Sequence, residues 1–273
     1  MSFIPQREKL KLKKVIVIFA VMYFGITSIL YFSQDNILFR PTILAQDFEY
    51  QFSYPFEELF LKPETDAVIN ALHFKAEKPK GVILYFHGNA GDLSRWGKIT
   101  EYFVEMQYDV LVMDYRNYGK SSGTLTEEAL YLDAQFCYDY LLKTYSEQDI
   151  IVYGRSLGTA IATYVASKNR PELLILETPY YSMVDVARSG FPLLPIKYLL
   201  KYKLPSHKFI DNVKCNILMI HGTEDEVIPL EIAKKLFEVA PKGKSTFITI
   251  EGGEHNNLSE FTEYNEAIKD LLQ

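Results

Sequence analysis

After residue 50, blocks of hydrophobic and polar residues alternate along the chain and predict strands and helices in turn. Continuous apolar runs that end in a turn, such as GVILYFHG, are typical of strands buried on both faces. The predicted strands are 57–62, 67–74, 81–88, 108–115, 149–154, 171–177, 214–222 and 245–250. Apolar residues at helical spacing predict helices over 94–106, 126–145, the stretch from residue 154 to about 168, 230–240 and 257–272.

The alternation predicts an α/β fold with a mostly parallel central sheet and helices on both faces. Strands separated by helices of ~10–15 residues imply right-handed βαβ crossovers. The first two strands, 57–62 and 67–74, are close enough to form an N-terminal hairpin. Residues 178–212 contain four prolines and no clear strand, so we expect an insertion there, over the C-terminal edge of the sheet. In open α/β sheets ligands bind at that edge.

The N-terminal segment has a different pattern. Val15–Phe32 is a run of 18 residues without a charge, close to the minimum length of a membrane-spanning helix. Basic residues precede the run, which by the positive-inside rule places the N-terminus in the cytoplasm and the folded domain on the far side of a single-pass membrane protein. We therefore predict four parts: a basic leader, a transmembrane helix, a linker and an α/β domain that contains the insertion, at 1–14, 15–34, 35–55 and 56–273.

Two other interpretations of the apolar run stay open. A cleaved signal peptide normally has an apolar core of ~7–15 residues followed by a small-x-small cleavage site. The run here is longer, and the triplets Ser28-Ile29-Leu30 and Phe32-Ser33-Gln34 fit the cleavage pattern poorly. A buried core helix is the third interpretation, although such a helix would not need a lysine-rich leader.

Charge and cysteine content narrow the function. The net charge is −6, and because residues 1–14 contribute +4, the remainder carries −10. An acidic domain argues against nucleic acid as a partner, since phosphate contacts need clustered lysine and arginine. The chain has two cysteines, Cys137 and Cys215, and no CxxC or Cys/His cluster, so no metal or redox site is expected. We expect two buried free thiols; a disulfide stays open if the compartment is oxidising.

The strongest chemical signal is Gly154-Arg155-Ser156-Leu157-Gly158. It follows a predicted strand and begins a predicted helix, which is the context of a nucleophile elbow. The two glycines permit a tight turn that lifts the serine hydroxyl above the sheet. An ordinary glycine-flanked turn capped by serine would have the same motif. Further residues favour the catalytic interpretation.

Asp225 and His255 are the predicted partners of Ser156. Each follows a predicted strand, in HGTEDEVIP and EGGEHNNL respectively, so all three lie at the same edge of the sheet. Their order along the chain, Ser, Asp, His, is that of the α/β-hydrolases. A serine hydroxyl needs an imidazole to accept its proton, and the imidazole needs a carboxylate to orient it.

Alternatives exist for both partners. Glu224 and Glu226 flank Asp225, and Glu177 follows another strand; any of these carboxylates is a possible acid. The remaining histidines are His73, His87, His207 and His221, of which the second and fourth precede glycine at a strand end, where a structural hydrogen bond is expected. His255 alone lies in a loop loosened by glycines, from which its side chain can reach Ser156.

An oxyanion site is predicted beside the nucleophile. The tetrahedral intermediate of acyl transfer needs two backbone donors, one from the residue after the serine and one from the loop after an earlier strand. These donors are the N–H groups of Leu157 and of Asn89, in His87–Gly91. A phosphate-binding loop is the rival interpretation, but the GK[ST] ending of such a loop is missing. No cofactor is expected.

At these residues the chain resembles the α/β-hydrolase superfamily over residues ~50–273, and within it the Bem46-type branch, the relatives of α/β-hydrolase domain-containing proteins 13 and 17. The segments that carry the resemblance are FHGNAGDLSRW (86–96), DYRNYGKSSG (114–123), YGRSLGTAIA (153–162), HGTEDEVIP (221–229), GGEHNN (252–257) and SQDNILFRP (33–41). The resemblance implies the same three catalytic residues and a membrane-tethered serine hydrolase. Some relatives cleave acyl thioesters of proteins, but this chain lacks their cysteine-rich N-terminal segment.

We therefore expect hydrolysis of a carboxylic ester or thioester of a small-molecule or lipid-like acyl substrate. A serine peptidase or a carbon–carbon hydrolase on the same fold is the alternative, because the fold does not choose among reactions. A non-catalytic membrane scaffold is a third possibility, against which the three residues in hydrolase order speak.

Overall fold

The computed structural model describes residues 6–272, and its centre is an eight-stranded sheet. The strands are β2 (Phe56–Leu61), β3 (Ile69–Phe74), β4 (Val82–Phe86), β6 (Asp109–Met113), β7 (Ile150–Arg155), β8 (Leu173–Glu177), β9 (Asn216–Gly222) and β10 (Ser245–Ile250), in the order β10-β9-β8-β7-β4-β6-β3-β2. Only β3 runs antiparallel to its neighbours β2 and β6. This confirms the predicted mostly parallel sheet with an N-terminal hairpin, and every strand boundary lies within two residues of its predicted place.

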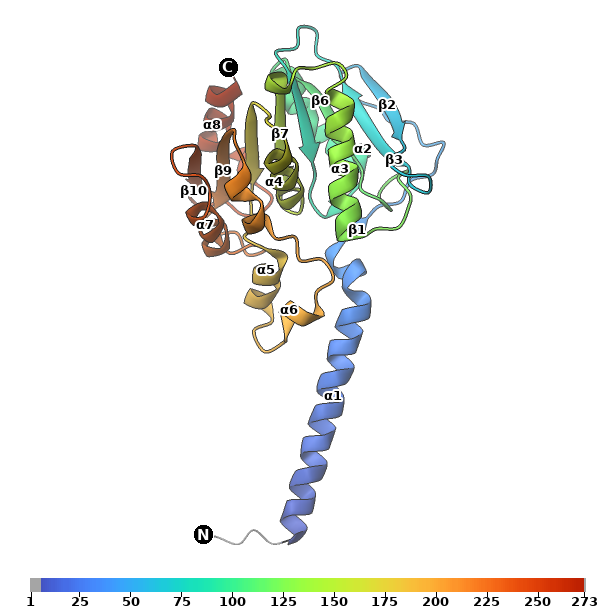
Figure 1. The fold of residues 1–273 in the computed structure, drawn as a ribbon, viewed down its shortest axis with the longest axis vertical. Helices are drawn as coiled ribbons and strands as arrows, with labels where there is room; N and C mark the ends of the chain where they lie inside the picture. The colour runs from blue at the N-terminus through green and yellow to red at the C-terminus, as the bar shows by residue number, and fades with distance from the viewer. Residues whose placement is uncertain (1–5, 273) are drawn as a thin grey trace.

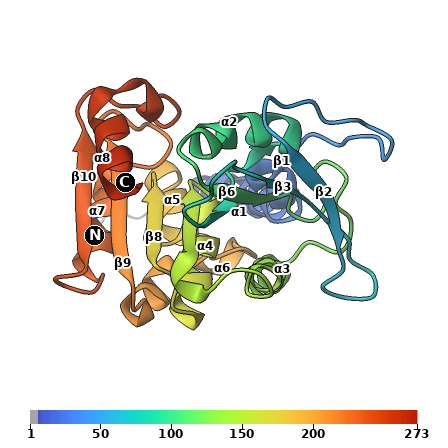
Figure 2. The same cartoon turned by 90° about the horizontal axis from the view of Figure 1, so that it is seen from above.

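Helices cover both faces of the sheet (Figure 2). One face packs against α2 (Leu93–Glu105) and α8 (Thr262–Leu272), the other against α3 (Glu127–Leu141), α4 (Gly158–Lys168) and α7 (Leu230–Glu238). Strand β4 shows why its sequence is apolar throughout. Val82, Leu84 and Phe86 belong to one core and Ile83 and Tyr85 to the other, because successive side chains of a strand point to opposite faces.

Two predicted helices end differently in the structure. The helix expected over 126–145 stops at Leu141, and Tyr145 instead turns back to the sheet, where its hydroxyl donates to Asp109. The helix expected over 257–272 is a 3₁₀ turn, Leu258–Glu260, followed by α8, because Phe261 between them has an extended backbone. In both cases the apolar residues keep a helical spacing across a local turn, so the periodicity alone predicts a longer helix than the structure has.

Helix α1 (Gln6–Leu38) projects away from the domain (Figure 1). It contains the predicted span 15–34 and the end of the predicted leader, whose residues 1–5 lie outside the described part of the chain. The stretch Leu10–Leu38 is long and apolar enough to cross a membrane, and almost none of it is buried. Its length and composition fit a membrane span or a signal sequence.

A short parallel pairing that the apolar pattern does not predict joins α1 to the domain. Strand β1 (Arg40–Pro41) pairs with β5 (Ala90–Gly91), which follows β4. The backbone N–H of Arg40 donates to the Asn89 carbonyl at 2.8 Å, and the Asn89 side-chain amide donates to the Leu38 carbonyl at 3.1 Å. The segment expected as a linker therefore begins with the end of α1 and a hydrogen-bonded strand.

Residues 178–212 leave the sheet after β8 and form two short helices, α5 (Met183–Gly190) and α6 (Ile196–Leu199), followed by two 3₁₀ turns, Ser206–Lys208 and Ile210–Asn212. This segment lies below the sheet, beside the upper part of α1 (Figure 1). The part of the segment that returns to the sheet is buried at Tyr202, Leu204 and Ile210, in the same core as α3 and α4. We call residues 183–200 the α5–α6 hairpin.

Candidate active site

Ser156 lies on a strained turn between β7 and α4. Its backbone φ is +51°, in the left-handed region that side chains other than glycine rarely adopt. The turn is held by the hydrogen bond from the Ser156 N–H to the Glu177 carbonyl, at 2.9 Å. A Cβ at Gly154 would lie 2.5 Å from the Gly158 carbonyl oxygen, and one at Gly158 would collide with the Phe86 carbonyl. Both glycines are therefore required by close backbone approach.

The structure brings together the three residues that the sequence predicts as catalytic. His255 Nε2 lies 2.9 Å from the Ser156 hydroxyl, and His255 Nδ1 lies 2.7 Å from Oδ2 of Asp225. With Nδ1–H donating to the carboxylate, Nε2 is free to accept the hydroxyl proton. Ser156 follows β7, Asp225 follows β9 and His255 follows β10, so all three lie at the carboxyl edge of the sheet.

Asp225 is buried and remains an anion. Its Oδ1 accepts the N–H groups of Val227 at 2.9 Å and Ile228 at 2.8 Å. Burial raises the pKa of this carboxyl, but the hydrogen bond and charge of His255 and the Ile228 N–H outweigh it, so that the pKa lies below its ordinary value. His221, buried beside it, bonds the Ile228 carbonyl through Nε2 at 2.8 Å, the structural role expected of it.

The alternative acids lie elsewhere. Glu224 and Glu226 are exposed to solvent. Glu177 is buried, but its carboxylate pairs with Arg155 at 3.1 Å and accepts the Tyr153 hydroxyl at 2.5 Å. Within residues 6–272, Asp225 is the carboxylate that bonds His255.

Two of the remaining histidines bond to groups outside the site. His73 Nε2 lies 2.9 Å from the Lys75 ammonium and 3.2 Å from the Tyr145 hydroxyl. His207 stacks on Tyr181 and bonds its carbonyl at 3.0 Å. Neither is near Ser156.

The predicted oxyanion donors also border Ser156. Asn89 and Ser156 line one pocket, and Leu157 is the residue after the serine, at the N-terminus of α4. For the N–H groups of Asn89 and Leu157 the described residues provide no hydrogen-bond acceptor. Two unpaired N–H groups beside a serine hydroxyl fit the requirement of an oxyanion site.

His87 fixes the orientation of one of these donors. Its Nδ1 donates to the Gly88 carbonyl at 2.7 Å, and that carbonyl belongs to the same peptide group as the Asn89 N–H. His87 Nε2 lies 3.3 Å from Oδ1 of Asp114, and both side chains are completely buried. Burial raises the pKa of Asp114 above its ordinary value. The sequence predicts a structural hydrogen bond for His87 but does not identify Asp114 as its neighbour.

The pocket above Ser156 has a volume of about 370 Å³ and a basic lining. Arg40, Arg95 and Arg155 all border it. Arg155 is neutralised by Glu177, whereas Arg40 and Arg95 form no ion pair with any residue of the range 6–272. The sequence pattern does not indicate Arg40 and Arg95 as pocket residues, because more than fifty residues separate them and no periodicity relates them. The only signal was their position in two segments that carry the resemblance, SQDNILFRP and FHGNAGDLSRW.

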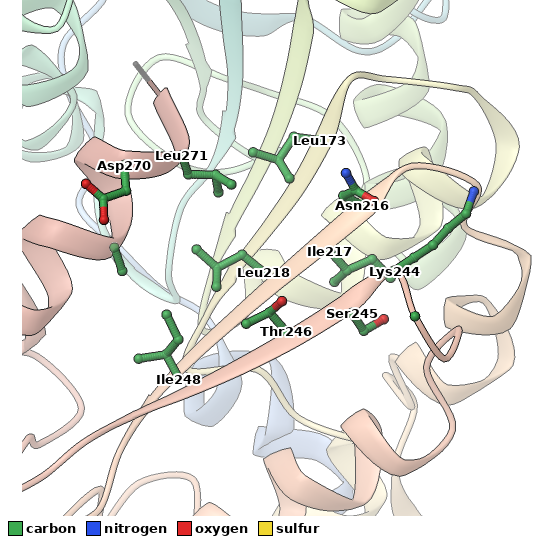
Figure 3. A pocket seen from close by; sticks show the side chains of 12 residues that line it. Leu173, Asn216, Ile217, Leu218, Lys244, Ser245, Thr246, Ile248, Asp270 and Leu271 are labelled. Atoms are coloured by element: carbon green, nitrogen blue, oxygen red, sulfur yellow. The ribbon is translucent and has the colours of Figure 1, made fainter.

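A second pocket, of about 470 Å³, lies at the opposite edge of the sheet (Figure 3). It is bordered by the first halves of β9 and β10 and by α8, with Leu218, Ile248 and Leu271 among its apolar side chains. Ser156 and His255 lie at the carboxyl ends of strands, so this pocket is not part of the candidate active site.

Comparisons with known proteins support the α/β-hydrolase fold of this chain. A family model described as the alpha/beta hydrolase fold matches residues 81–174. The chain is 30% identical over 237 residues to the uncharacterized protein R595 of Acanthamoeba polyphaga mimivirus, covering 78% of this chain and 80% of that protein. It is 28% identical over 233 residues to protein bem46 of Schizosaccharomyces pombe, covering 81% and 78%.

A third relative has an enzyme name. The chain is 29% identical over 192 residues to the lysophosphatidylserine lipase ABHD12 of Danio rerio, covering 63% of this chain but only 50% of that protein. This chain thus matches about half of the length of that relative. Among solved structures, an esterase of Pyrococcus furiosus superposes with a TM-score of 0.68 at 18% identity, covering 85% of this chain and 98% of the esterase, which shows a shared fold.

Proposed function

Because this chain belongs to the α/β-hydrolase family, in its Bem46-like branch, we propose that it is a serine hydrolase that cleaves a carboxylic ester or thioester through an acyl-enzyme. The observation that carries the proposal is the pair of hydrogen bonds made by His255, 2.9 Å to Ser156 and 2.7 Å to Asp225. Relatives and structural neighbours include a lipase and an esterase, which favours an ester over a peptide.

The residues give each chemical step a group to perform it. The Ser156 oxygen attacks the substrate carbonyl carbon while its proton passes to His255 Nε2, and the oxyanion accepts the N–H groups of Asn89 and Leu157. The carbon–leaving-group bond then breaks, and His255 gives its proton to the alcohol or thiol that leaves. Water attacks the acyl-serine by the same route, which releases the acid and restores Ser156.

The charge of the pocket favours an ester that carries an anionic group. Arg40 and Arg95 border the space above Ser156 without a carboxylate partner in residues 6–272. Arginine binds phosphate and carboxylate through charge-assisted hydrogen bonds. A relative is named a lysophosphatidylserine lipase, whose substrate name denotes an anionic lipid. We therefore propose a lipid-like ester with a phosphate or carboxylate close to the scissile bond.

We further propose that α1 stays attached and crosses a membrane, with the N-terminus cytoplasmic and the catalytic domain on the far side. The length and apolar composition of α1, its exposure and the basic residues before its apolar run support this orientation. Labelling of cysteines placed at Lys11 and at Glu224 with a membrane-impermeant maleimide would test it. Labelling of residue 11, and not of residue 224, from outside intact cells would contradict the proposed orientation.

The catalytic proposal is tested with the full chain in detergent and p-nitrophenyl esters of graded chain length. Ser156→Ala is expected to lower the turnover number by about 10⁶-fold, the loss typical of a removed serine nucleophile. Ser167→Ala is the matched control, because the Ser167 hydroxyl bonds only the Tyr164 carbonyl of its own helix among the described residues. Neutral and anionic lysophospholipids then test the charge preference.

Three outcomes separate the interpretations. Loss of turnover in Ser156→Ala alone supports the serine mechanism, and the chain-length optimum gives the size of the acyl site. Unchanged hydrolysis by Ser156→Ala contradicts it. No turnover of any ester by the unmodified chain would favour a peptide or carbon–carbon substrate, or a scaffold.

A further inference from the structure

The tip of the α5–α6 hairpin is unusually apolar for an exposed surface. The exposed fractions are 89% for Leu193, 81% for Tyr198 and 55% for Phe191. Exposed large apolar side chains that cluster on one short segment mark an interaction surface more often than single ones do. What they contact is indicated by their position relative to α1.

The hairpin is bound to the last turns of α1. The Gln34 side chain donates to the Leu199 carbonyl at 3.1 Å and accepts the Lys201 N–H at 2.7 Å. The Lys201 ammonium lies 3.2 Å from Asp35 and 5.3 Å from the centre of the Tyr31 ring. Tyr31 belongs to the uncharged run Val15–Phe32, so the hairpin reaches the level at which that run ends.

The covered face of α1 shows that the contact extends further down. Thr27 and Gln34 are buried and Leu30 is half-buried, whereas the other apolar side chains of α1 between Leu10 and Ile37 are exposed. These three residues share one face of α1, and α6 is in contact with this helix. Thr27 lies five residues inside the end of the uncharged run, or about 8 Å at the rise of an α-helix. If that run lies in lipid, the hairpin tip lies at the depth of the lipid headgroups or below them.

The charge of the segment fits such a position. From 186 to 210 the chain contains five basic residues and no acidic one, in a protein with a net charge of −6. The basic residues are Arg188, Lys197, Lys201, Lys203 and Lys208. Basic residues around exposed tyrosine and leucine are typical of segments that lie in the surface of an anionic membrane.

The active site faces the same side. Arg40, which borders the pocket above Ser156, is only two residues beyond the end of α1, and the hairpin leaves the sheet from the same carboxyl edge. From Phe32 to Leu38 the helix rises about 9 Å. The pocket is therefore within reach of an ester whose acyl chain remains in the bilayer.

We propose that the tip of the α5–α6 hairpin, around Phe191, Leu193 and Tyr198, inserts into the surface of the bilayer crossed by α1 and holds the carboxyl edge of the sheet against the lipid. The inference rests on the membrane anchoring proposed above for α1. It goes beyond anchoring, because it gives the catalytic domain a fixed orientation and a second membrane contact. It also names the substrate pool as esters resident in the leaflet that the hairpin touches.

The test uses the full chain in vesicles of phosphatidylcholine and phosphatidylglycerol, with an environment-sensitive fluorophore on a single introduced cysteine. Cys215 is replaced by serine, and Cys137 is buried and left in place. The labelled positions are Leu193→Cys at the tip, Phe24→Cys in α1 and Leu142→Cys as the matched control. Leu142 is 41% exposed and follows the C-terminal end of α3. The N-terminal end of α3 is the end near the hairpin, because the Glu127 carboxylate there accepts the Lys203 N–H.

The expected result is a blue shift and quenching by brominated lipid at positions 193 and 24, and neither at position 142. Quenching at position 24 together with a water-exposed label at position 193 would overturn the inference but not the membrane span of α1. The exposed tip would then be a surface for a protein partner. No quenching at 24 would overturn the anchor and the inference together. Catalysis by Ser156 is measured separately on soluble esters, so its failure is distinguishable from both.

A functional measurement complements the labelling. Leu193→Glu with Tyr198→Glu is expected to lower hydrolysis of an ester embedded in vesicles by about tenfold or more, because charged side chains oppose insertion into lipid. Hydrolysis of p-nitrophenyl acetate should stay unchanged, since neither residue borders the pocket. Equal loss on both substrates, or on neither, would contradict the proposal.

Discussion

At the scale of single residues, Ser156 keeps a backbone conformation that costs roughly 1–2 kcal/mol for a residue with a side chain. Its φ of +51° persists because the Ser156 N–H is bonded to the Glu177 carbonyl and the Thr159 N–H to the Ser156 carbonyl, each at 2.9 Å. Strain held in this way at Ser156, the proposed nucleophile, points its hydroxyl out of the sheet edge. The role proposed for His255 depends on that placement.

The role of Asp225 is testable against its neighbours. Asp225→Asn is expected to lower kcat by about 10⁴-fold, because an amide no longer selects the His255 tautomer that leaves Nε2 free to accept the proton. Glu224→Gln and Glu226→Gln remove charges of the same sign from exposed positions in the same loop and should change kcat little. The measurement is kcat on a soluble ester. If either glutamate variant lost as much kcat as Asp225→Asn, that glutamate would be assigned as the acid in place of Asp225.

His73 makes the stability of the domain depend on pH. Burial, aided by the charge of Lys75, lowers the pKa of His73 from 6.5 to about 4. Below pH 6.5 the unfolded chain binds a proton at this residue that the folded chain does not, so the free energy of unfolding falls as the pH falls towards 4. Between pH 7 and pH 5 this loss is about 2 kcal/mol.

His73→Gln removes this titration. The free energy of unfolding, measured with a denaturant at the two pH values, should fall by about 2 kcal/mol less in the variant than in the unmodified chain. Equal losses in the two proteins would show that His73 is not neutral in the folded state.

At the scale of secondary-structure elements, the junction between β7 and α4 depends on the absence of two side chains. A methyl group at Gly158 would overlap the carbonyl oxygens of Phe86 and His87, which are backbone atoms of the neighbouring strand and loop. Gly158→Ala is therefore expected to lower the free energy of unfolding by about 3 kcal/mol or more, with loss of activity. The thermal midpoint measures the first effect.

Gly190→Ala is the matched control, because nothing lies within 4 Å of a Cβ added at Gly190. This change should leave the thermal midpoint within a few degrees of its original value. A Gly158→Ala protein as stable and active as the control would mean that the turn is looser than the described backbone.

Apolar runs predicted the strands, because each strand of a sheet covered on both faces needs apolar residues at nearly every position. The three proposed catalytic residues were predicted from the same strands, because the carboxyl ends of parallel strands lie at one edge of the sheet. The pairing of Arg40–Pro41 with Ala90–Gly91 was missed, because two residues carry no periodicity. The short helices α5 and α6 were missed because four prolines interrupt the pattern of residues 178–212, and the apolar pattern does not show that Phe191, Leu193 and Tyr198 are exposed.

At the scale of the whole molecule, the arrangement of α1 against the domain depends on Gln34. Both polar atoms of this buried side chain form hydrogen bonds with backbone groups, one with Leu199 in the α5–α6 hairpin and one with Lys201 directly after it. Gln34→Ala is expected to raise the hydrogen-exchange rate of the Lys201 amide by about five- to tenfold, since one net hydrogen bond is lost there.

Two controls make this measurement specific. Asn36→Ala, at an exposed position of the same helix, should leave the exchange of Lys201 unchanged. The Phe191 amide, bonded at 2.9 Å to the Ala187 carbonyl, should keep its rate in both variants. Unchanged exchange of Lys201 in Gln34→Ala would mean that the hairpin keeps its place by other contacts.

The arrangement of the whole molecule was the least accessible to sequence reasoning. Charge and hydropathy indicated that residues 15–34 form a separate apolar helix, but the contacts of Gln34 and Asp35 with Leu199 and Lys201 join residues more than 160 positions apart. Single polar side chains at such separations leave no pattern along the chain. The basic pocket could not be predicted for the same reason, because Arg40 and Arg95 come to border one pocket only after folding.

The strand pairing between Arg40 and Ala90 decides where the chain can be cut to make a water-soluble enzyme. A protein that starts after Thr42 would lack the Leu38 carbonyl and the Arg40 N–H. Asn89 would then lose two hydrogen-bond partners and keep the Tyr118 hydroxyl, which donates to its carbonyl at 2.7 Å. It would also lack Phe39, which is buried and packs against Tyr202, with 4.7 Å between the centres of the two rings. A cut just before Ser33 keeps all of these groups and removes the uncharged run, so a recombinant catalytic fragment should begin there.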